Sequence, residues 1–490
     1  MELIMNVCVI IGVVLGFFYV FARRFNEIWY SFKLGRKIYK SLPPGDLGWP
    51  FVGSTLAFNK AFRVVGDPYT FIHTHLLRYG RVGMYKSHLF GMPTVIVTNP
   101  EICRRIYLDD ECFEPNYPKS VKILETNGNF LKIEHKIGYK IIASPMNGSE
   151  VLSKHVEFIE QLVEMGLEEW SSMRREPIEV MDKIGGLFFK VVLHIFLGNE
   201  IDDQAMAELH TLYKELGLVI MSFLPYDLPG FTYRRALKAR NKIEKILRCV
   251  IEKKRKRFEK DDGTTEVYSL LDKLIVAKNE NGSKSYSDDT IIDLLLGTFF
   301  AGHNTPATAA MWALLHISQN PHIFQMAKEE QESIIRQRPS TQKGLTFQEI
   351  KQMKFLTKFI NEVLRRNTVA PTNFRKAKTN VNINGYTIPK GWTVQIWSVA
   401  VHMDSQIYSN PQDFDPSRWD NYTPKPGEFI PFGLGSKFCP GSELAKLEMT
   451  ILLHHFVLNY KVEPVDQNCN DTRLPSAKPM GLCRIVRVSQ

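Results

Sequence analysis

The apolar positions of the chain are densest at its start, where 20 consecutive residues from Leu3 to Ala22 contain one strongly polar side chain, that of Asn6. This length matches the roughly 20 residues that a helix needs to cross a bilayer. Six basic residues and one acid follow between positions 23 and 40, and such charge favours the cytosolic side. We therefore expect a single transmembrane anchor at residues 1–22 with a cytosolic body. A cleaved signal peptide is the alternative, but its basic residues would precede the apolar run.

Beyond this run, helical hydrophobic periods dominate the pattern. Apolar residues recur every three to four positions in Val156–Trp170 and Ile178–Leu197, which is typical of amphipathic helices. The longest helical segment, Ser287–Ser318, has no wide polar face and is expected to be buried. Thr346–Glu349 is a capping box that predicts the start of a helix extending through Val363. Short strands are expected at Val82–Tyr85, Thr94–Val97 and Thr393–Trp397, and Asn384-Gly385 predicts a hairpin turn.

These elements predict a mainly α fold with a small β portion. Leu42-Pro43-Pro44-Gly45 stops any helix and predicts a stiff, extended hinge. No Ser/Gly-rich linker and no internal repeat divides the chain beyond it. We therefore expect an anchor at residues 1–22, a basic and proline-rich hinge at 23–48 and one large globular domain at 49–490, although length alone would allow about three domains.

Composition narrows the classes of partner. The 490 residues carry a formal net charge of +10, spread along the chain. No compact basic array with interleaved aromatic residues is present, so we expect no nucleic-acid binding; a membrane lipid surface or an acidic partner protein suits the charge better. The seven cysteines are scattered without a Cys-x-x-Cys, so neither a zinc ribbon nor a disulfide framework is indicated.

One cysteine, Cys439, ends a glycine-broken aromatic turn that begins at Pro431 and precedes a helical run from Ser442 to Leu458. A thiolate there would be surrounded by backbone N–H groups that Gly433, Gly435 and Gly441 leave free, and such donors tune the charge of a metal-bound sulfur. A buried free cysteine in a Gly/Pro turn is the alternative interpretation.

Two further motifs contain polar residues at informative spacing. In Ala301-Gly302-His303-Asn304-Thr305-Pro306, the proline has no N–H for the Gly302 carbonyl, which predicts a kink centred at Gly302. Taken alone, this segment is explained equally well as a structural break in the helix. Glu362 and Arg365 have the i,i+3 spacing that places them on one helix face, where such a pair is often exposed and of small energetic value.

The motifs, in this order, resemble those of the cytochromes P450. The haem-binding loop of that family, Phe-x-x-Gly-x-Arg-x-Cys-x-Gly, is matched at Phe432, Gly435, Cys439 and Gly441, with Lys437 in place of arginine. The resemblance covers nearly the whole chain and implies a haem-thiolate fold. It implies that Cys439 is the axial ligand of the haem iron and that these loop residues bind the cofactor.

The same resemblance implies roles on the long helix. The family pattern is Ala/Gly-Gly-x-Asp/Glu-Thr, in which the helix opens at Ala301 and Gly302 to admit oxygen and water, and the Thr305 hydroxyl delivers protons. Asn304 replaces the acid of this pattern and cannot shuttle a proton as a carboxylate does. We therefore expect proton delivery to be slowed or rerouted.

Other positions follow from the family layout. Glu362 and Arg365 are expected to be buried, joined by Arg418 of the Phe414–Trp419 segment, and to hold the haem loop. Arg375 is expected to bind a haem propionate, and His135 stands at the aromatic or histidine position of a helix over 134–142. The propionate base of that helix is missing: Tyr139 occupies its position, so a phenol hydrogen bond or the neighbouring Lys140 is expected instead.

More narrowly, Pro43–Pro50 and Ile383–Trp392 resemble plant microsomal members of the kaurenoic acid oxidase and β-amyrin oxidase group. This implies a haem b monooxygenase of the endoplasmic reticulum membrane that hydroxylates or serially oxidises a small apolar terpenoid. Its electrons would come from NADPH through a flavoprotein reductase. Two alternatives stay open: an isomerase, dehydratase or non-catalytic haem binder, which Asn304, Pro306 and Tyr139 motivate, and a haem-free membrane scaffold. The family layout lines the expected pocket with residues 121–126, 216–231, 296–305, 370–374 and 478–482.

Overall fold

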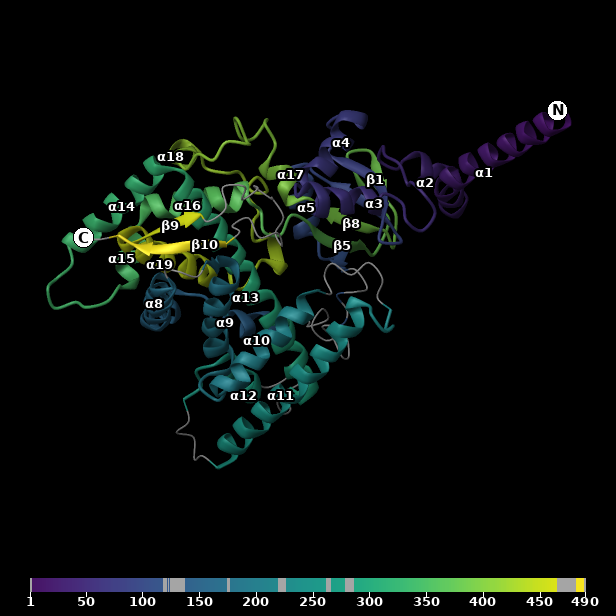
Figure 1. The fold of residues 1–490 in the computed structure, drawn as a ribbon. Coiled ribbons are helices and arrows are strands. Elements are labelled where there is room, and N and C mark those ends of the chain that lie inside the picture. The colour runs from purple at the N-terminus through teal and green to yellow at the C-terminus, as the bar shows by residue number, and fades with distance from the viewer. Residues whose placement is uncertain are drawn as a thin grey trace.

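The computed structural model describes residues 2–117, 121, 123, 137–173, 177–218, 226–260, 266–277, 286–464 and 482–488. A helical body carries small sheets, and helix α1 (Glu2–Leu34) projects from one side (Figure 1). The predicted mainly α fold with a small β portion is thus confirmed. The helices and helical turns after α1 are α2 (Arg36–Lys40), α3 (Thr55–Asn59), η1 (Lys60–Val65), α4 (Tyr69–Tyr79), α5 (Pro100–Leu108), α7 (Ile137–Ala143), α8 (Ser149–Ser172), α9 (Val180–Leu197), α10 (Asp203–Gly217), α11 (Thr232–Lys260), α12 (Leu270–Val276), α13 (Asp288–Gln319), α14 (Pro321–Arg336), α15 (Phe347–Gln352), α16 (Lys354–Arg366), α17 (Ser398–His402), α18 (Arg418–Asn421), η4 (Gly435–Lys437) and α19 (Ser442–Asn459).

Helix α13 is the most deeply buried long helix because its apolar residues leave no wide polar face. Its first turn is capped by Ser287, whose hydroxyl accepts the Thr290 N–H at 3.3 Å. At 32 residues it spans about 48 Å. Pro306 lies inside the helix without ending it, and α13 packs against α9, α16 and α19.

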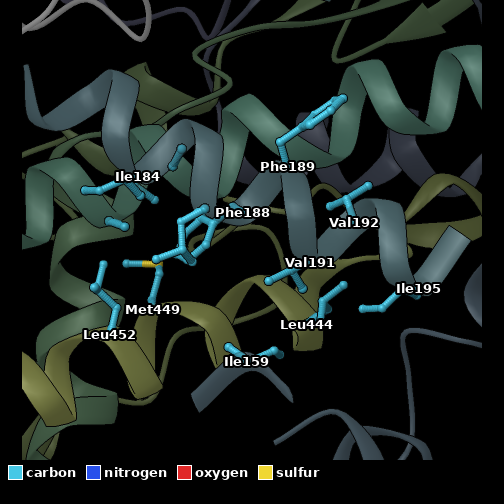
Figure 2. Packing of buried hydrophobic residues seen from close by; sticks show 14 of the residues in the cluster. Ile159, Ile184, Phe188, Phe189, Val191, Val192, Ile195, Leu444, Met449 and Leu452 are labelled. Carbon is cyan, nitrogen blue, oxygen red and sulfur yellow. The ribbon is translucent and has the colours of Figure 1, made fainter. Parts of the chain in front are cut away.

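Helix α9 contributes to the core on two faces. Phe188 and Val191 lie near Met449 and Leu444 of α19, whereas Phe189 points in another direction (Figure 2). The ring of Phe189 lies 6.3 Å from that of Phe299 on α13. The 3.6-residue period places positions 188 and 191 on one face and position 189 on another.

In the described part of the chain, the β portion consists of three small sheets. The largest has the order β1-β2-β8-β5-β3, in which β2 and β8 are parallel and the other neighbours are antiparallel. Asn384 and Gly385, with φ of 50° and 83°, form the turn of the β6–β7 hairpin, as the Asn-Gly dipeptide predicts. The strands are β1 (Met84–Leu89), β2 (Met92–Val97), β3 (Phe113–Pro115), β4 (Ile178–Glu179), β5 (Asn373–Ala377), β6 (Val381–Ile383), β7 (Tyr386–Ile388), β8 (Thr393–Ile396), β9 (Tyr460–Pro464) and β10 (Leu482–Arg487).

The segment expected to be a hinge is packed against the globular body. Helix α1 continues through the basic residues, and the buried Asn26 side chain donates to the carbonyl oxygens of Leu47 (3.0 Å) and Trp49 (2.7 Å). Glu27 accepts the Leu47 N–H at 3.0 Å and pairs with Lys86 of β1 at 2.9 Å. Because these bonds satisfy the backbone of the proline-rich segment, this segment is held firmly between α1 and the body.

Helix α1 has the length and apolar character that a membrane-crossing helix needs. Among the described residues it is the helix that is long and apolar enough to span a bilayer, over Val9–Leu34. This window extends past Ala22, where the apolar run in the sequence ends. The reason is that Ile28, Trp29 and Phe32 continue an exposed apolar face between the basic residues.

The predicted helix from Thr346 through Val363 is two helices. The capping box is present, but α15 ends at Gln352 and α16 begins at Lys354. The carboxylate of Glu330 on α14 accepts the N–H groups of Phe355 (2.6 Å) and Leu356 (3.0 Å). Glu330 thus caps the start of a second helix, and residues near Lys354 in the sequence do not predict this contact.

Candidate active site

Cys439 lies in a closed turn between η4 and α19. Its N–H donates to the carbonyl oxygen of Phe432 at 2.9 Å, and the Phe438 N–H donates to that of Gly435 at 3.1 Å. Gly433 and Gly435 have φ of 73° and 71°, a left-handed conformation that favours glycine. The glycines therefore allow the tight turn that presents the sulfur at the start of a helix.

The surroundings of the Cys439 thiol act in opposite directions. Burial raises its pKa, and the backbone N–H of Gly441 lowers it by hydrogen-bonding the thiolate. The sulfur also precedes the first turn of α19, where the helix dipole favours negative charge. The net effect is a raised pKa, so the thiolate needs a bound cation to stabilise it.

We expect Gly435→Ala to destabilise this turn. A Cβ at position 435 would lie 2.6 Å from the Tyr107 carbonyl oxygen, in addition to the unfavourable φ. The left-handed conformation alone costs a residue with a Cβ about 1–2 kcal/mol. Thermal unfolding followed by circular dichroism should show the loss. Gly441→Ala is the matched control, because its Cβ would meet only Met146 Sδ at 3.7 Å; equal midpoints for both variants would contradict the expectation.

Glu362, Arg365 and Arg418 are brought together by the structure. Glu362 and Arg365 are fully buried and joined by two hydrogen bonds, of 2.9 Å from Nε and 2.7 Å from Nη2. Arg418 Nε lies 3.5 Å from Glu362. The carboxylate also accepts Trp419 Nε1–H at 3.1 Å and the Asp415 N–H at 3.0 Å. Sequence reasoning assigned no contact to Trp419, and its position beside Arg418 is the signal that was available.

His402 connects this buried cluster to the cysteine turn. Arg365 Nη1 donates to the His402 carbonyl oxygen at 2.9 Å, and His402 Nε2 accepts the Ile430 N–H at 3.0 Å. Burial, followed by the charge of Arg365, lowers the pKa of His402 to about 3, so the ring is neutral and able to accept. The Ile430 carbonyl oxygen then accepts the Gly433 N–H at 3.2 Å. Sequence reasoning missed this connection because it passes through backbone atoms.

The centre of α13 presents a local change of exposure. Ala301 and Thr305, one turn apart, are exposed, whereas His303 is fully buried and Gly302 lies against Val192 of α9. The Thr305 hydroxyl donates to the Ala301 carbonyl oxygen at 2.8 Å. Asn304 is half-buried. This otherwise buried helix is thus exposed on one face, at Ala301 and Thr305.

The remaining predicted site residues divide among several elements. Arg375 is buried on β5, beside β3. Burial lowers the pKa of Lys437 on η4, and the charge of Arg375 lowers it further. Tyr139 lies on α7 near Cys439, since burial and then the thiolate charge raise its pKa; Lys140 is exposed. His135 lies outside the described residues.

A sequence model of the cytochrome P450 family matches residues 43–484. The chain belongs to the cytochrome P450 family. It is therefore a P450 monooxygenase, as the sequence predicts. This P450 is 44% identical over 476 residues to beta-amyrin 11-oxidase of Glycyrrhiza uralensis, covering 96% of this chain and 95% of the relative. It is 43% identical over 482 residues to ent-kaurenoic acid oxidase 2 of Arabidopsis thaliana, covering 97% of each. The predicted resemblance to this group is confirmed.

A solved P450 structure agrees with the fold. Retinoic acid-bound cyanobacterial CYP120A1 superposes with a TM-score of 0.78 at 23% identity, covering 91% of this chain and 99% of the other. The match extends over the helical body and supports the fold alone, since the identity is low.

The residues of this P450 fit the haem that the family implies. Cys439 supplies a thiolate in a turn where Gly435 permits no Cβ. Arg375 is a buried guanidinium with no carboxylate within 4.0 Å among the described residues, and it therefore suits a carboxylate of the cofactor. Ala301 and Thr305 are exposed on the otherwise buried long helix. Together they provide an iron ligand, an anion partner and a small-residue face.

Proposed function

We propose that this P450 is a membrane-anchored haem-thiolate monooxygenase that hydroxylates or serially oxidises a terpenoid, either a triterpene or a diterpene acid such as kaurenoic acid. The observation that carries the proposal is the closed turn that presents Cys439 at the start of α19. The names of its relatives, beta-amyrin 11-oxidase and ent-kaurenoic acid oxidase, support the substrate class. An apolar substrate also suits a pocket reached beside a membrane.

The chain's own residues would hold haem b in a defined way. Cys439 would ligate the haem iron, and a haem held by a thiolate would supply the capacity to cleave the O–O bond of oxygen. Phe432 packs near Phe438, with ring centroids 6.3 Å apart, and both line the turn. Gly435 and Gly441 would let the backbone of the turn approach the haem closely, since they carry no side chain. Lys437 and Arg375 would place positive charge beside the haem carboxylates.

The proximal cluster has a positioning role in this proposal. Glu362 pairs with both Arg365 and Arg418, and His402 links this cluster to the backbone of Ile430, just before the cysteine turn. None of them exchanges a proton with substrate. They hold the turn rigid so that the thiolate stays in place.

On the opposite side, Thr305 moves protons and Asn304 orients water, beside Ala301 and Gly302 where oxygen enters. In the structure the Thr305 hydroxyl is bonded to the Ala301 carbonyl oxygen, so its oxygen keeps acceptor capacity for water. Asn304 donates and accepts hydrogen bonds but does not ionise. Proton supply is therefore the step that we expect to limit this enzyme.

We expect Asn304→Asp to improve proton supply. A carboxylate at position 304 exchanges protons with water, so the rate of product formation should rise by about tenfold, below the 10²–10⁴ of a fully effective general acid, and the product formed per NADPH consumed should rise towards one. Gas chromatography of products beside NADPH oxidation measures this ratio. Asn304→Ala is the control and should lower it; a lower ratio in the aspartate variant as well would contradict the expectation.

Electrons would come from NADPH through a flavoprotein reductase that docks on basic surface of the body. Helix α1 would anchor the protein in the endoplasmic reticulum membrane by a single pass, with the catalytic domain in the cytosol. The length and apolar character of α1 support the anchor, and its bonds to Leu47 and Trp49 keep the body close to the lipid.

Microsomes that contain the full chain test the proposal. They would be incubated with a panel of triterpenes and diterpene acids, with and without the reductase and NADPH. Oxygenated product that requires both supports the monooxygenase. Product that forms without them would instead favour an isomerase or dehydratase on the same fold, the alternative that Asn304 motivates.

A further inference from the structure

The guanidinium of Arg375 needs an anion. The residue is 5% exposed, and its Nη1 donates to the carbonyl oxygen of the neighbouring Phe374 at 3.0 Å. No carboxylate of the described part of the chain lies within 4.0 Å of it. Because a buried charge is stable only when it is paired, Arg375 marks an anion site beside the cysteine turn.

Tyr117 reaches this anion site by strand pairing. Pro115 of β3 lies opposite Arg375 of β5, and the Asn116 N–H donates to the Phe374 carbonyl oxygen at 3.4 Å. The next residue, Tyr117, places its ring 6.4 Å from that of Phe374. Burial raises the pKa of Tyr117 and the charge of Arg375 opposes the rise. The phenol is therefore protonated at neutral pH and able to donate a hydrogen bond near Arg375.

Tyr107 fixes the position of Arg375 from the other side. Its ring lies 5.3 Å from the Arg375 guanidinium carbon, which is a cation–π distance. A Cβ at Gly435 would clash with the Tyr107 backbone, so α5, Arg375 and the cysteine turn are in close contact. The anion site is thus built from β5, the segment after β3, α5 and η4.

Helix α7 carries Tyr139 where the family layout has a base, and the neighbouring Lys140 is exposed. Burial, followed by the charge of Cys439, raises the pKa of the Tyr139 phenol. Tyr117 is the phenol that lies near Arg375 outside the platform formed by Tyr107.

We propose that the Tyr117 hydroxyl donates a hydrogen bond to the haem carboxylate that pairs with Arg375, and that it takes the place of the base that the family layout has at position 139. This inference rests on the proposed haem site at Cys439. Tyr117 is thereby a cofactor-binding residue that neither motif spacing nor the family layout assigned.

Haem dissociation tests the proposal without reference to catalysis. The purified full-length ferric holoenzyme would be mixed with excess apomyoglobin, and haem transfer followed by absorbance at pH 7. Tyr117→Phe keeps the ring and removes only the donor, so we expect haem loss about tenfold faster than in the wild type. Tyr117→Arg restores a donor and should lose haem at close to the wild-type rate. Tyr139→Phe is the matched control and should behave as the wild type.

The outcomes separate this inference from the function on which it rests. A wild-type protein that binds no haem overturns both. A wild type that binds haem, together with Tyr117→Phe losing it at the wild-type rate, overturns the role of Tyr117 alone. Faster haem loss in Tyr139→Phe than in Tyr117→Phe would assign the role to α7. If Tyr117→Phe fails to accumulate, rapid haem loss from Tyr117→Arg overturns the proposal.

Discussion

Replacing Cys439 with alanine should abolish the thiolate-type Soret band of the reduced carbon-monoxide difference spectrum. The Cys439 sulfur is the atom that the closed turn and the first turn of α19 both present. Alanine removes the metal ligand and leaves the backbone bonds of the turn in place. We therefore expect complete loss of the band, because none of the described histidines occupies a comparable turn to replace the ligand.

The measurement uses microsomes reduced with dithionite, with protein amount determined by immunoblotting. Cys249→Ala is the control, since Cys249 is an exposed free cysteine on α11. It should keep the full band. A thiolate-type band in the Cys439 variant would contradict both the ligand assignment and the proposed function.

Replacing Arg365 with alanine should have the largest effect on stability. It leaves Glu362 fully buried with Arg418 at 3.5 Å as the nearest described cation, and it removes donors to the carbonyl oxygens of His402, Pro411 and Asp413. Breaking a buried pair in this way costs about 3–5 kcal/mol. This is a large share of the roughly 5–15 kcal/mol by which a folded protein is stable.

Chemical unfolding monitored by circular dichroism, together with the yield of haem-containing protein, would measure the loss. Lys358→Ala on the same helix is the matched control, because its pair with Asp420 is exposed and such pairs contribute less than about 1 kcal/mol. Arg365→Lys keeps the charge but loses the planar fork, so it should lie between the two. A stability loss no larger than that of the control would contradict a positioning role for Arg365.

Glu362 and Arg365 show what can be predicted from the sequence and what cannot. Their i,i+3 spacing places them on one helix face, and that much is local geometry. Whether the pair is exposed or buried depends on Trp419, Asp415 and Arg418, which the chain brings back some 55 residues later. Burial raises the stability that is lost on breaking the pair from less than about 1 kcal/mol to about 3–5 kcal/mol. Burial itself is a tertiary property.

Local chemistry alone determined the apolar helix α1, the long buried helix with its Ser287 cap, the Asn384-Gly385 hairpin and the glycine turn around Cys439. Each depends on residues close in sequence, through periodicity, capping or permitted φ. Tertiary structure decided the rest: Glu330 divides the predicted helix into α15 and α16, Asn26 and Glu27 fix the supposed hinge to the body, and strand pairing brings Tyr117 to Arg375. These outcomes depend on which distant polar group satisfies a backbone N–H, carbonyl or charge, and that is settled only when the chain has packed.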